Sequence, residues 1–200
     1  MKKPNRSAWS INTFLNILFW ILIARGIFSA GYHIRELYSL FTDPAALTGE
    51  TGLTIDYLTL DAVNGFGIDL DTAVKMKLIH LISAIVLTVI ECRGVHILKQ
   101  VLLPLELNQP FRTGISGSIG KLSQCAFHMG LSENLSMLAT TVLIENHYAL
   151  DAILVNGPIT GVTIHAEFRS AWLVVAVVLG ILFTVFRRGE ELQTLADETL

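Results

Sequence analysis

Long apolar segments restrict the fold of this chain more than any other feature. The last of them, residues 171–186, carries no charged side chain between Trp172 and Phe183 and stops at Arg187 and Arg188. About 20 apolar residues, each adding about 1.5 Å to a helix, cross the hydrocarbon core of a bilayer, which is about 30 Å thick. The pattern predicts four membrane-spanning helices, over residues 9–32, 74–98, 119–144 and 171–186.

The third segment is the least apolar of the four. Polar side chains interrupt it at Lys121, Gln124, His128, Glu133 and Asn134. Leucines still recur at a spacing of three to four residues, which predicts an amphipathic helix with a polar stripe toward the inside of a bundle. The distribution of basic residues, described below, also requires this crossing.

The composition agrees with a membrane protein. Apolar residues make up 52% of the chain and charged residues 16%, compared with about 25% charged residues in an average globular domain. The formal charge of −3 gives no net basic surface, so we expect no direct nucleic-acid binding. Cys92 and Cys125 both fall within predicted spans, which argues against a disulfide framework.

Basic residues are divided unevenly between the two sides of the predicted membrane. One side holds Lys2, Lys3, Arg6, Arg93, Lys99, Arg112, Lys121, Arg187 and Arg188, and the other holds Arg35, Lys75, Lys77 and Arg169. This asymmetry predicts a multi-pass protein of the bacterial inner (cytoplasmic) membrane with both termini in the cytoplasm. The first apolar run, residues 11–31, is longer than the roughly 7–15 residues of a signal peptide, so we expect a retained helix.

The two predicted outer loops, residues 33–73 and 145–170, contain strand signals. Residues 53–60 are rich in strand formers, and Asn156-Gly157 separates two β-branched runs in the manner of a hairpin. We expect this hairpin, residues 153–155 and 159–164, to pair with the strand of the first loop. The predicted fold is therefore an all-α membrane protein, a four-helix transmembrane bundle with a small extracytoplasmic β-cap, in one domain of residues 1–200.

Two short motifs carry a resemblance to a known family. One is Asn-Gln-Pro-Phe at residues 108–111, and the other is Phe-Arg-Arg-Gly-Glu-Glu-Leu-Gln at residues 186–193. Together they resemble the bacterial integral membrane family known as domain of unknown function 2975, as a divergent member, because Thr194 and Leu195 replace acidic residues usual in the family. The resemblance implies four spans, no assigned activity and no cofactor. Genes of this family often lie beside a helix-turn-helix regulator, which implies a cytoplasmic regulatory partner.

The same motifs supply candidate partner-docking residues. Gly189 is placed to end the fourth helix as a C-cap, and the residues after it form a short cytoplasmic tail, for which an inert solvated tail is the alternative. The candidate docking residues are Pro110, Phe111, Gly189, Glu191, Leu192 and Gln193.

Arg25 and Glu133 are ionisable residues inside predicted spans. An arginine at such a depth costs roughly 2.5–3.5 kcal/mol, and the two residues differ in predicted height by about 9 Å, which a long side chain can largely close. They predict an intramembrane charge pair, either as an ion-linked site or, by preference, as a structural pair supported by Ser132 and Asn134. Two histidines and two cysteines inside the spans lack tight ligand spacing, so we expect no metal site: His80, His128, Cys92 and Cys125.

The chain carries no nucleophile elbow, phosphate loop or zincin pattern, so we expect no enzyme. The leading hypothesis is a non-enzymatic sensor, or a regulatory or immunity-type subunit, that exposes its outer loops to envelope signals and its cytoplasmic segments to a partner. The alternative is a small transporter or channel subunit that uses the Arg25–Glu133 pair. That alternative requires a homo-oligomer, because four helices enclose little pore.

Overall fold

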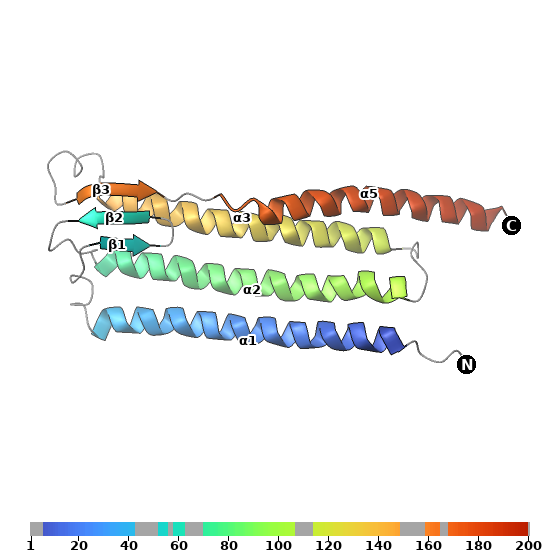
Figure 1. The fold of residues 1–200 in the computed structure, drawn as a ribbon, viewed down its shortest axis with the longest axis horizontal. Helices are drawn as coiled ribbons and strands as arrows, with labels where there is room; N and C mark the ends of the chain where they lie inside the picture. Colours follow the sequence, from blue (N-terminus) through green and yellow to red (C-terminus); the bar gives the residue numbers. More distant parts are fainter. Residues whose placement is uncertain are drawn as a thin grey trace. The chain divides into compact units, whose positions relative to one another are not determined.

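The protein is described from a computed structural model, which places residues 6–42, 52–55, 58–62, 70–106, 114–148, 159–164 and 168–199. Figure 1 follows these elements along the chain, with helices and short strands in the order α1, β1, β2, α2, α3, β3 and α5. The helices are α1 (Arg6–Thr42), α2 (Leu70–Glu106), α3 (Ile115–Tyr148) and α5 (Ala171–Glu198).

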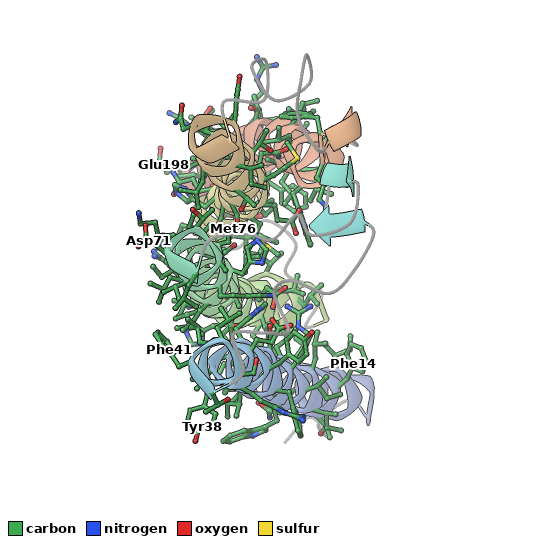
Figure 2. All side chains as sticks on the ribbon, turned by 90° about the vertical axis from the view of Figure 1, so that its left-hand side faces the viewer. Phe14, Tyr38, Phe41, Asp71, Met76 and Glu198 are labelled. Carbon is green, nitrogen blue, oxygen red and sulfur yellow. The ribbon has the colours of Figure 1, made fainter. Side chains whose placement is uncertain are left out.

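Three of these helices are long and apolar enough to cross a membrane. The qualifying segments are Ile11–Thr42, Leu70–Pro104 and Ala171–Glu198. Large apolar side chains also point outward along them, including Trp20 at 67% exposed and Phe28 at 78%. Figure 2 shows two more, Tyr38 and Phe41, projecting away from the end of α1. Apolar side chains turned outward along apolar helices are what a surrounding hydrocarbon solvent requires, and the chain is a helical membrane protein.

Helix α3 is as long as the others but does not qualify as a span by composition. Its polar residues, among them Lys121, His128 and Glu133, lower its mean hydropathy. The predicted third helix is therefore present, while its crossing of the membrane stays a prediction.

The helices extend well past the segments predicted from hydropathy. Residues 33–42 and 70–73, predicted as part of the first outer loop, are helical. The predicted C-cap at Gly189 is wrong, because α5 continues through it to Glu198. The residues that follow Gly189 are mostly good helix formers, including three glutamates, two leucines and an alanine, and they sustain the helix.

The chain divides into two compact units, each built from parts of the helices. The first comprises Met1–Gly26, Leu87–Leu131 and Ser170–Leu200, and the second comprises Ile27–Val86 and Ser132–Arg169. In the first unit, Val101, Ile115 and Ile119 form a buried cluster against Leu179 and Phe183. This cluster joins α2, α3 and α5.

Glycines let the helices of the first unit approach closely. A Cβ added at Gly120 would lie 3.2 Å from the Phe183 ring, and one at Gly130 would lie 3.0 Å from Leu173 Cδ2. Beside them, the Ser123 hydroxyl donates a 2.7 Å hydrogen bond to the carbonyl of Ala176. Small residues therefore pack α3 against α5, as is common in membrane helices.

The second unit carries a three-stranded antiparallel sheet in the order β1–β2–β3. Strand β1 (Gly52–Ile55) pairs with β2 (Leu58–Ala62), and β2 pairs with β3 (Ile159–Ile164), with a register shift between Asp61 and Ala62. The single strand predicted over residues 53–60 is instead two strands that pair with each other. The predicted hairpin arm at residues 153–155 lies outside the described residues, and the location of the sheet outside the membrane stays a prediction.

Candidate functional site

A group of polar side chains from three helices lies together in the second unit. We call it the polar cluster: His33 and Glu36 of α1, Lys77 and His80 of α2, and Thr140 of α3. Lys77 Nζ donates to Glu36 Oε2 at 2.8 Å, and His33 Nδ1 lies 3.7 Å from the same oxygen. The rings of His33 and His80 meet edge to face, with centroids 5.9 Å apart. Lys77 and His33 thus meet at the Glu36 carboxylate, and Thr140 of α3 joins the cluster through His80.

The side chains of the polar cluster are partly buried. The side chains of His33, Glu36 and Lys77 are 18%, 26% and 29% exposed. Removing charges from water is unfavourable unless they are paired, and here the ammonium of Lys77 supplies the pairing for Glu36. The Lys77–Glu36 ion pair therefore ties α2 to α1.

The Thr140 hydroxyl links α3 to His80 of α2. The Thr140 hydroxyl donates its one hydrogen to the carbonyl of Ser136 at 3.0 Å, and its oxygen lies 3.3 Å from His80 Nε2. The hydroxyl therefore has one possible partner on its own helix and one on α2. In contrast, His33 Nδ1 is buried without a hydrogen-bond partner, which marks it as the least satisfied polar atom of the cluster.

The polar cluster was missed by the sequence analysis. His33 was assigned to the first outer loop, where a solvated side chain is expected, and Lys77 to the outer end of the second span. Once the helices are extended, His33 and Glu36 stand three positions apart on one helix and Lys77 and His80 three apart on the next, so each pair shares a face. That spacing was the available signal, and the estimated helix ends hid it.

Arg25 forms an ion pair with Glu91 of α2 in the first unit. The Glu91 side chain is 14% exposed and that of Arg25 is 59% exposed. The predicted partner of Arg25, Glu133, belongs to the second unit, so the Arg25–Glu133 pair stays a prediction. Asn134, predicted to support that pair, instead bonds the backbone of Arg169, accepting from its N–H and donating to its carbonyl at 3.2 Å each.

Comparison with known proteins adds no assignment. No protein-family model, curated protein or solved structure matches this chain. Within the described ranges, no three histidine, cysteine, aspartate or glutamate residues lie close enough to hold a metal ion.

The candidate docking residues fall into two groups. Pro110 and Phe111 lie outside the described residues. Gly189, Glu191, Leu192 and Gln193 are all in α5, and every residue from 191 to 199 is exposed. We call residues 191–199 the α5 tail.

The α5 tail begins directly after a residue that holds α5 to α3. Glu190 Oε1 accepts the backbone N–H of Ser116 at 2.7 Å, and its Oε2 accepts the Ser116 hydroxyl at 2.9 Å. Ser116 lies in the first turn of α3, just after Gly114, whose φ of 97° favours glycine. The Glu190 carboxylate therefore acts as an N-terminal cap of α3, although it belongs to a helix that is distant in the sequence. Its negative charge complements the dipole of α3.

We expect Glu190→Ala to destabilise the first unit by about 1–2 kcal/mol, because the first turn of α3 loses a charged cap. Glu191→Ala is the matched control: Glu191 is adjacent and exposed, and among the described residues it pairs with Arg187 on its own helix at 3.2 Å. Thermal unfolding in detergent gives the stability, and amide exchange at Ser116 gives the local effect. Equal results for the two variants would contradict the capping role.

Proposed function

We propose that this protein is a non-enzymatic regulatory subunit of a bacterial inner membrane that binds a cytoplasmic partner through the α5 tail. In this proposal the four helices cross the membrane, both termini face the cytoplasm, and the β-sheet lies on the opposite side. The proposal also includes membership of the uncharacterised family that the 186–193 motif resembles. The observation that carries it is the α5 tail itself, a helical segment with exposed leucines.

The length of α5 supports this arrangement. Residues 171–190 form about 20 helical residues, or roughly 30 Å, which is enough to cross the hydrocarbon. If α5 crosses, the next residues extend past the hydrocarbon as an ordered helix. An exposed helix end normally frays, so the apolar residues of this ordered and exposed helix end are best explained by a partner.

The side chains of the α5 tail indicate the chemistry of that partner. Leu192 and Leu195 are 67% and 59% exposed and stand three positions apart, on one side of the helix. Glu191, Asp197 and Glu198 surround them with negative charge. A surface complementary to this helix has an apolar groove with basic residues at its rim. Amphipathic helices commonly bind by placing their apolar face in such a groove. A helix-turn-helix regulator meets the charge requirement, because DNA-binding proteins are basic.

The transporter alternative rests on the Arg25–Glu133 pair. The ion pair of Arg25 in the structure is with Glu91, so no specific observation favours transport.

We expect the double substitution Leu192→Asp and Leu195→Asp to reduce recovery of a soluble partner to about a tenth or less. Each leucine removed from an apolar groove loses roughly 1.5–3 kcal/mol, and 1.4 kcal/mol corresponds to a factor of ten. The measurement is co-purification of the tagged chain from its native membrane. Thr194→Asp is the control, because Thr194 is exposed on the same tail but turned away from Leu192. The proposal fails if the double variant recovers the same soluble protein as the unsubstituted chain.

A further inference from the structure

The first unit contains a cavity of about 430 Å³ to which no role has been assigned. Its walls come from all four helices, with Leu18 and Leu22 from α1 and Trp172 and Leu179 from α5. The space exists because the facing positions on α2 and α3 are small, at Gly94, Cys125 and Ala126. Its volume lies within the range of pockets that hold small-molecule ligands.

The backbone of Gly94 borders this space without filling it. A Cβ built on Gly94 would meet no atom within 4 Å, although Gly94 lies in the middle of α2 and lines the cavity. Two other glycines of the same unit differ from Gly94, since a Cβ at Gly120 or Gly130 would contact an α5 side chain. Gly94 therefore leaves volume unfilled, where the other two allow helices to pack.

The surface of the cavity is almost entirely apolar, and one carboxylate-bearing side chain lies in its wall. Glu91 is the only charged residue among the described residues that line it, and the remaining lining is apolar or weakly polar. One Glu91 oxygen is engaged by Arg25, and a carboxylate offers about four acceptor positions in all. A hydroxyl that reaches the Glu91 carboxylate from the cavity can therefore donate a hydrogen bond to it while the ion pair stays intact.

The charges of Glu91 and Arg25 restrict which head group a bound amphiphile can carry. An anionic head would face the Glu91 carboxylate, and a cationic head would compete with Arg25 for it. A neutral head with a hydroxyl hydrogen avoids both conflicts. We propose that this cavity binds a single-chain lipophilic alcohol, whose chain occupies the apolar walls and whose hydroxyl donates to Glu91. The site goes beyond the proposed docking function, because its occupancy does not require the α5 tail.

The test uses Trp172, which lines the cavity, as the reporter. The sample is the full chain with Trp9→Phe and Trp20→Phe, reconstituted in phospholipid nanodiscs. The probe is an ω-bromo long-chain primary alcohol, whose bromine quenches tryptophan fluorescence on contact. We expect saturable quenching of Trp172. Gly94→Leu is expected to weaken the apparent affinity about tenfold or more, because its side chain fills the space of the ligand. Gly117→Leu is the matched control, since a Cβ at Gly117 also meets nothing within 4 Å but lies outside the lining.

Two further comparisons keep the result interpretable if Gly94→Leu does not fold. The ω-bromoalkane of equal length lacks the hydroxyl and is expected to quench more weakly in the parent chain. A chain that retains only Trp20, which is 67% exposed, reports simple partitioning into the bilayer and is expected to show no saturation. Equal quenching by alcohol and alkane, or saturation that Gly94→Leu leaves unchanged, would overturn the proposal. So would equally strong quenching by a brominated phospholipid, which would assign the cavity to bilayer lipid. None of these outcomes depends on partner recovery through the α5 tail.

Discussion

Gly26→Ala is expected to destabilise the protein by about 1–3 kcal/mol, a large effect for one methyl group. A Cβ at Gly26 would overlap the side chain of Thr88, whose own Cβ would lie only 3.0 Å away. Thr88 is β-branched and cannot move aside without leaving its rotamer, so α1 and α2 must separate. The measurement is the unfolding midpoint in a denaturing detergent titration of the purified chain.

Gly31→Ala is the matched control and is expected to have the opposite sign. Gly31 lies on the same helix, and a Cβ there meets nothing within 4 Å. Alanine stabilises a helix by up to about 1 kcal/mol relative to glycine when there is room for it. Adding Thr88→Ala to Gly26→Ala should restore part of the lost stability, as expected for two residues in contact. If both alanine variants change the midpoint in the same direction, the close approach of α1 and α2 at Gly26 is wrong.

Lys77→Met is the second substitution with a large expected effect, a loss of about 1–3 kcal/mol. It leaves Glu36 partly buried without its ammonium partner, and removing one member of such a pair costs more than the pair contributes. Thermal unfolding, followed by circular dichroism at neutral pH, gives the change in stability.

Lys75→Met supplies the comparison on the same helix. Lys75 pairs with Asp71 one turn away, and both side chains are more than half exposed, so its loss should cost less than about 0.5 kcal/mol. Combining Glu36→Gln with Lys77→Met should recover much of the stability, because no uncompensated charge is left. Equal losses for Lys75→Met and Lys77→Met would mean that the polar cluster is solvated and contributes little.

Hydropathy located the helices of the described chain but misplaced their ends. The method detects where apolar residues stop, whereas helical hydrogen bonding continues as long as local propensity and contacts allow. At the end of α1 the continuing residues include Glu36, which Lys77 partners from α2. At the end of α5 a glycine was taken as a stop signal, although the residues beyond it favour helix.

The contacts of the candidate sites were harder to predict. Depth along a helix gives the height of a charge, but the partner also depends on which faces meet, and for Arg25 the partner present is Glu91. The bond between Glu190 and Ser116 joins positions 74 residues apart and carries no local sequence signature. Such contacts are set by helix packing, which a single sequence does not encode in any short motif.

If a partner binds the α5 tail as proposed, the unbroken course of α5 through Gly189 sets the direction from which it approaches. Val178, Ile181, Val185 and Leu192 follow one another at three-, four- and seven-residue intervals, so they share one azimuth around the helix axis, and all are more than half exposed. In a membrane the first three face lipid. Leu192 then points along the same azimuth just beyond the hydrocarbon, so a protein bound to it would lie against the membrane surface beside the bundle.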